Sequence, residues 1–167
     1  MKNLILTRHA KSSWQHPGLS DIDRPLNARG EKNAPVMGNV LFQAGVKPDF
    51  WLSSPAVRAY STAKHFAHSY QENQSIITTD MHIYEASTQT LLRVIQAIQD
   101  IYQCVLLFGH NPGITNVTNF LCGNLISRIP TAGVACITLN IDHWTDVTQQ
   151  SGVLDHYFYP KQIQEMV

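Results

Sequence analysis

The sequence predicts an α/β fold, a three-layer α/β/α arrangement in which a mostly parallel central sheet has helices on both faces. Short apolar runs alternate along the chain with longer segments of helical periodicity, which is the pattern of strands joined by helical crossovers. Residues 4–6 and 104–108 are apolar without alternation, as expected of strands buried on both faces. The length of 167 residues suits one domain, which we expect to span 1–167.

The first half of the chain contains clear turn and cap residues. A strand over 4–6 should be followed by a loop over 15–25, which is rich in Pro, Gly and Asp. A helix is expected from about Arg29 to Ala44, because Gly45 can end it.

A second strand, over 50–52, runs into Ser53-Ser54-Pro55. Ser54 suits a helix N-cap and Pro55 suits the first helical position. We expect this helix to continue to about residue 69.

The second half repeats the alternation and ends in strands. After the apolar run at 104–108, Asn111 can cap a helix that begins at Pro112. The other expected elements are a strand over 75–79, a helix over 88–100, the end of the capped helix near 122, and strands over 134–140 and 153–159 that can pair antiparallel with the rest of the sheet.

The charge balance excludes several classes of partner. Twelve Lys and Arg against twelve Asp and Glu give zero net charge, so we expect no nucleic-acid and no membrane partner. Within residues 1–64 nine basic residues face four acidic ones, an excess of five positive charges. The three cysteines form no CxxC pair and the N-terminus lacks a signal-peptide core, so a cytoplasmic location is expected.

Residues typical of a phosphate site follow three of the predicted strands. The first strand ends at Arg8-His9, the second leads to Arg58 in a helix, and the run at 104–108 ends at His110. In open α/β sheets the ligand site lies beyond the carboxyl ends of the strands. Two guanidinium groups, two imidazoles and two helix N-termini at one edge would bind a tetrahedral oxyanion such as phosphate.

Two histidines in such a site suggest phosphoryl transfer. A neutral imidazole is a competent nucleophile, and a second imidazole can donate a hydrogen bond to a phosphoryl oxygen. His9 is the better candidate for the nucleophile because it directly follows a strand end and Arg8. His110 is then the donor, and an unidentified neighbouring group has to hold the tautomer of His9.

The motifs TRHAKSSW, DRPLNARG, LSSPAVRAYSTA and LLFGHNPGI resemble, in this order, those of the histidine phosphatase (phosphoglycerate mutase-like) superfamily, and within it the SixA-type phosphohistidine phosphatases. The resemblance covers residues 3 to about 160. It implies that His9 is phosphorylated during turnover and that Arg8, Arg58 and His110 complete the phosphate pocket. Arg24 of DRPL matches a further phosphate-contacting arginine, although pairing with a nearby aspartate is an equal alternative. The usual RHG signature reads Arg8-His9-Ala10 here.

The resemblance also bears on the substrate. Larger relatives insert a helical lid that often carries an acid, whereas this chain has little room for a lid between Arg58 and His110. An open site suits a phosphohistidine-bearing protein, such as a signalling or phosphocarrier protein, hydrolysed without metal or cofactor. Glu85 is a weak candidate for a proton donor, and a solvated glutamate is an equal alternative. The alternatives for function are a small-molecule phosphomonoesterase and a non-catalytic phosphoprotein-binding module.

Two further patterns in the sequence suggest a different chemistry, a cysteine phosphatase loop and a metal site. Cys122 to Arg128 matches the C-x5-R signature of cysteine phosphatases, but Cys122 falls at a predicted helix end instead of after a strand. His65 and His68 share a helix face, without an evident carboxylate or Cys partner, so no metal site is expected.

Overall fold

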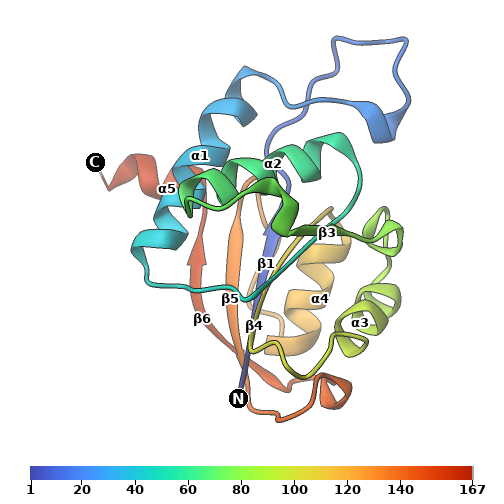
Figure 1. The fold of residues 1–167 in the computed structure, drawn as a ribbon, viewed down its shortest axis with the longest axis vertical. Coiled ribbons are helices and arrows are strands. Elements are labelled where there is room, and N and C mark those ends of the chain that lie inside the picture. Colours follow the sequence, from blue (N-terminus) through green and yellow to red (C-terminus); the bar gives the residue numbers. More distant parts are fainter. Residues whose placement is uncertain (167) are drawn as a thin grey trace.

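The computed structural model describes residues 1–166 and contains a six-stranded sheet between two layers of helices (Figure 1). The strands are β1 (Lys2–Arg8), β2 (Phe50–Ser53), β3 (Ile77–Thr79), β4 (Cys104–Gly109), β5 (Val134–Leu139) and β6 (Gly152–Phe158). The helices are α1 (Ala28–Gln43), α2 (Val57–Ser69), α3 (Thr88–Gln96), α4 (Gly113–Cys122) and α5 (Pro160–Glu165). The α/β fold class is therefore confirmed.

The sheet has the order β3-β2-β4-β1-β5-β6. Strands β1 to β4 are parallel, and β5 pairs antiparallel with both of its neighbours, β1 and β6. Strands β1, β2 and β4 are neighbours, and their carboxyl ends lie at one edge of the sheet. The backbone N–H of His9 donates to the carbonyl of Gly109 at 3.0 Å, and that of Ser54 donates to Phe108 at 3.0 Å. These bonds extend the pairing past the strand ends and fix the relative positions of the loops that follow.

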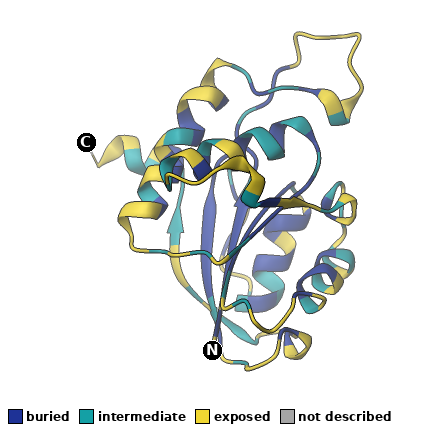
Figure 2. Ribbon diagram, viewed as in Figure 1, coloured by how far each residue is buried: buried dark blue, intermediate teal, exposed yellow. Residues whose placement is uncertain are grey.

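The core is divided between the two faces of the sheet, and the central strands β1 and β4 are buried over most of their length (Figure 2). Leu4 and Leu6 pack with α3 and α4, whereas Ile5 packs with α1 and α2. Successive side chains of a strand point to opposite faces, so an unbroken apolar run is what a central strand between two helical layers requires. Among the described residues, no helix combines the length and apolar character needed to cross a membrane.

The helix boundaries differ from the sequence-based expectations at several ends. Helix α2 begins at Val57 with Ala56 as its N-cap, and α4 begins at Gly113 with Pro112 as its N-cap. Ser54 is therefore not the cap that its sequence position predicts. Helix α3 ends at Gln96, before the predicted end at Asp100.

The remaining differences are short elements. Strand β3 covers 77–79, short of the predicted 75–79, and the predicted loop over 15–25 contains a turn of 3₁₀ helix at Asp21–Asp23. Helix α5 was missed because its six residues, with Pro160 at the start, have no apolar periodicity long enough to recognise.

Candidate active site

The ends of β1 and β4 bring His9 and His110 together, as the parallel strands predict. Their ring centroids lie 5.2 Å apart, and each residue is only 7% exposed. The ring of Tyr84 packs edge-on against His110 at 5.5 Å between centroids. The two imidazole rings therefore lie next to each other, largely buried, at the edge of the sheet.

The backbone around His9 fixes its tautomer. Nδ1 of His9 lies 2.7 Å from the carbonyl oxygen of Ala10, and a carbonyl only accepts, so the ring proton is on Nδ1. The N–H of Ala10 donates to Oγ1 of Thr62, whose hydroxyl donates to the carbonyl of Arg58. Ala10 is fully buried without a left-handed backbone, so the departure from RHG is accommodated. The second ring nitrogen, Nε2, keeps its lone pair for a nucleophilic role.

Burial keeps both histidines neutral. It lowers the pKa of His9 to about 3, and the nearby His110, Arg58 and Arg8 act in the same direction. Burial, followed by the Arg58 cation, lowers the pKa of His110 to about 4. Neutral imidazole is the form that can attack phosphorus, so the site favours the reactive form of His9 at neutral pH.

Two arginines complete the cluster. Arg58 is 5% exposed and donates from Nη1 to the backbone oxygen of Asp21 at 2.7 Å and from Nη2 to its carboxylate at 2.9 Å. Arg8 donates from Nη1 to the carbonyl of Ile129 at 3.0 Å. Burial, and secondarily Arg128, lowers the pKa of Arg8 to about 10, which leaves it cationic at neutral pH.

Three nitrogen atoms of this cluster have no hydrogen-bond partner in residues 1–166. They are Nε of Arg8, Nε of Arg58 and Nδ1 of His110, and all three are buried. Buried donors are normally satisfied, so a group of unpaired ones marks a place where a ligand is expected. A tetrahedral oxyanion supplies several acceptor oxygens at once and complements the two guanidinium charges.

Ser54 contacts the site instead of capping α2. Its Oγ lies 2.8 Å from Nε2 of His110 and accepts from the N–H of Ala56 at 3.2 Å. When the Ser54 hydroxyl donates to Nε2, the proton of His110 is on Nδ1, the unpartnered atom. In this tautomer the N–H of Nδ1 is free to donate to a ligand in the site.

Arg24 is connected to the site through Asp21, a residue that the sequence analysis did not assign. Nε of Arg24 lies 3.1 Å from the Asp21 carboxylate, and Nη1 donates to Oγ of Ser12 at 2.9 Å. Its guanidinium lies 3.6 Å from the ring centre of Trp14. The aspartate pairing considered from the sequence is present, and it joins Arg24 to Arg58. Hydrogen bonds from Tyr84, first, and then from Arg58 lower the pKa of Asp21 to about 2.

The other candidates lie outside this cluster. Glu85 follows Tyr84 with a left-handed backbone (φ 52°), is exposed, and has no side-chain hydrogen bond among the described residues. Cys122 is the last residue of α4, and burial raises its pKa to about 11, so its thiol is protonated. This placement is that of a helix end and not of a cysteine phosphatase loop.

The metal interpretation has no support in the described part of the chain, where no three His, Cys, Asp or Glu side chains gather as ligands. One detail of the sequence analysis was wrong. His65 does have a carboxylate partner, because its Nε2 lies 2.6 Å from Glu31. Glu31 comes from α1, so the sequence around His65 could not reveal the contact.

Comparison with known proteins identifies the family. Residues 4–89 match the family model of the histidine phosphatase superfamily, branch 1. The chain belongs to the histidine phosphatase superfamily. An uncharacterized chloroplastic protein of Arabidopsis thaliana is 30% identical over 160 residues, which are 90% of this chain and 72% of that protein.

Solved phosphatase structures share the fold over nearly the whole chain. A protein of Agrobacterium tumefaciens, provisionally assigned as phosphohistidine phosphatase SixA, superposes with a TM-score of 0.80 at 29% identity, covering 95% of this chain and 98% of that one. The protein histidine phosphatase SixA in complex with tungstate gives a TM-score of 0.81 at 20% identity, covering 96% and 99%. A mycobacterial glucosyl-3-phosphoglycerate phosphatase with bound vanadate gives 0.71 at 14%, covering 96% and 100%. The fold is thus of the SixA type, and neighbours in it bind phosphate analogues.

Proposed function

We propose that this protein is a phosphohistidine phosphatase that works through a phosphorylated His9. The observation that carries the proposal is the group of buried, unpartnered donors on Arg8, Arg58 and His110 beside a neutral His9. These donors can surround the three equatorial oxygens of a transferring phosphoryl group, which is where charge has to be stabilised.

The reaction proceeds in two displacements. Nε2 of His9 attacks phosphorus, the P–N bond of the substrate breaks, and the leaving imidazole takes up a proton. Water then attacks the phosphorus of phospho-His9, the second P–N bond breaks, and inorganic phosphate and His9 are released. Arg8, Arg58 and His110 bind the phosphoryl oxygens in both steps, and Arg24 contributes through its pairing with Asp21, which faces Arg58.

The candidate proton donors favour a phosphoramidate substrate. Asp21 has a pKa of about 2 and is ionised at neutral pH. Burial and the neighbouring Asp21 raise the pKa of Tyr84 to about 12. The Tyr84 hydroxyl donates a hydrogen bond to the Asp21 carboxylate and stays protonated. Glu85 is exposed and held by no hydrogen bond among the described residues. Phosphohistidine needs less help from a general acid than an alkyl phosphoester does, so this set of groups suits it better.

The substrate is proposed to be a protein. Between β2 and β4 the chain forms only α2, β3, α3 and two short 3₁₀ turns, which leaves no long insertion to close over a small molecule. We further propose that the reaction needs no metal, that residues 1–167 act as one domain, and that the enzyme works in cytoplasmic signal transduction. The three free cysteines are compatible with a reducing compartment.

Hydrolysis by the purified protein tests this proposal. Chelator-treated protein should release phosphate from a phosphohistidine-bearing protein, and more slowly from p-nitrophenyl phosphate. Faster hydrolysis of small phosphomonoesters than of phosphohistidine would support the phosphomonoesterase alternative. Tungstate binding without turnover of either substrate would identify a phosphoprotein-binding module.

A further inference from the structure

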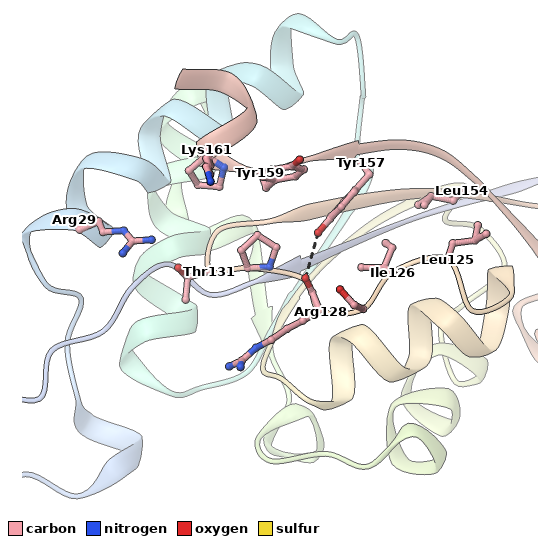
Figure 3. Close-up of a pocket in the computed structure, with 12 residues that line it drawn as sticks. Arg29, Leu125, Ile126, Arg128, Thr131, Leu154, Tyr157, Tyr159 and Lys161 are labelled. Atoms are coloured by element: carbon pink, nitrogen blue, oxygen red, sulfur yellow. Dashed lines mark hydrogen bonds between the residues drawn. The ribbon is translucent and has the colours of Figure 1, made fainter. Parts of the chain in front are cut away.

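A groove outside the phosphate site lies between the start of α1, the loop joining α4 to β5, and the junction of β6 with α5 (Figure 3). Its volume is about 570 Å³. We call it the basic groove, because Arg29, Arg128 and Lys161 line it and none of its lining residues is acidic.

The three cations of the basic groove have no side-chain partner among the described residues. All three residues are exposed, and within residues 1–166 their side chains form no ion pair and no hydrogen bond. In Figure 3 the Arg29 and Arg128 side chains extend on either side of Thr131, and Lys161 lies above them. Cations that pair with nothing in their own chain can bind acidic side chains of a partner without first breaking an existing contact.

The groove also offers apolar surface held in place by the fold. The rings of Tyr157 and Tyr159 pack at 5.1 Å between centroids, and the hydroxyl of Tyr157 donates to the carbonyl of Arg128. Leu125, which is 66% exposed, also lines the groove. Ordered aromatic rings next to exposed aliphatic side chains are typical of the buried centre of protein interfaces.

The basic groove borders a second cavity that reaches Arg8 of the phosphate site. A smaller cavity of about 380 Å³ shares Ser127 and Arg128 with the groove and also includes Arg8 of the site. A partner that extends from the groove past Arg128 would therefore lie next to Arg8. These shared lining residues place the groove beside the phosphate site.

We propose that the basic groove docks an acidic segment of the phosphoprotein substrate, whose glutamates or aspartates pair with Arg29, Arg128 and Lys161 and whose aliphatic side chains pack on Tyr157 and Tyr159. The inference rests on the proposed function, because it takes the occupant to be the protein that carries the phosphohistidine. Docking here would hold the phosphorylated residue near Arg8 and so give the open site its preference for proteins.

The test compares two substrates with the double variant Arg29→Gln/Lys161→Gln. The probes are a peptide whose central phosphohistidine is flanked by glutamates and leucines, and p-nitrophenyl phosphate, which occupies only the phosphate site. At low salt the variant should raise the KM of the acidic peptide roughly 2- to 30-fold, from two exposed ion pairs. Its kcat and its hydrolysis of p-nitrophenyl phosphate should not change. The matched variant Lys47→Gln/Lys64→Gln, which removes two exposed charges outside the groove, should behave as wild type.

A binding measurement separates docking from catalysis. The unphosphorylated acidic peptide, fluorescently labelled, should bind wild type in anisotropy titrations and lose affinity by the same factor in Arg29→Gln/Lys161→Gln. A peptide with lysines in place of glutamates should not bind. The docking proposal would be overturned if Arg29→Gln/Lys161→Gln and Lys47→Gln/Lys64→Gln bound the acidic peptide with equal affinity. It would also be overturned if the groove bound anionic phospholipid vesicles in place of the peptide. Docking without hydrolysis of the phosphohistidine peptide would overturn the proposed function alone.

Discussion

Acidification should destabilise the protein through the two buried histidines of the site. Burial holds the pKa of His9 near 3 and that of His110 near 4, against 6.5 for an ordinary histidine. Between these values the unfolded chain binds protons that the folded chain excludes, so stability is complete above pH 6.5 and declines as the pH falls. At pH 5, which is 1.5 units below 6.5, the loss is about 2 kcal/mol for each histidine.

Urea denaturation at pH 7 and pH 5, in buffers free of phosphate and other oxyanions, measures this effect. Wild type should lose about 2 kcal/mol more free energy of unfolding between the two pH values than His9→Gln or His110→Gln, because glutamine does not titrate. The control His16→Gln changes an exposed histidine and should retain the wild-type difference. An identical pH dependence in wild type and His9→Gln would refute the argument that burial keeps His9 neutral.

Three further substitutions test separate parts of the site. Thr62→Val leaves the buried N–H of Ala10 without its acceptor and should lower the free energy of unfolding by about 1–3 kcal/mol in urea denaturation; an unchanged value would contradict this role. Asp21→Asn should lower the free energy of unfolding by no more than about 1 kcal/mol, because the Asp21 side chain is 42% exposed and its ion pairs are screened by solvent. A loss several times larger would show that these ion pairs are much stronger. Cys122→Ser should retain wild-type phosphatase activity, whereas a loss confined to this variant would restore the cysteine mechanism.

The cluster of the two histidines and two arginines could be predicted because parallel neighbouring strands end at the same edge. Arg8 is the last residue of β1, His9 and His110 directly follow β1 and β4, and Arg58 lies in the first turn of α2, after β2. Position along the chain was therefore enough to predict that these residues lie close together. Their pairing and protonation depend on groups that sequence position does not reveal.

Asp21 and Ser54 illustrate this limit. Asp21 lies in a loop whose path is set by contacts with Arg58 and Tyr84, far along the sequence. Ser54 has the sequence signature of an N-cap, but the helix begins later and its hydroxyl contacts His110 instead. The one signal that could have indicated Asp21 is its position three residues before Arg24, although Asp23 lies even closer along the chain. The carbonyl of Ala10 left no sequence signal, since every residue has one.

Trapping the phosphorylated intermediate tests the central claim most directly. Wild-type protein should be mixed with a phosphohistidine-bearing protein, quenched in alkali within the first turnover to preserve acid-labile phosphate, and mapped by mass spectrometry. We expect one phosphate on His9, absent from His9→Ala, which should also lose turnover. Turnover with no phosphate on His9, or full activity of His9→Ala, would contradict the mechanism.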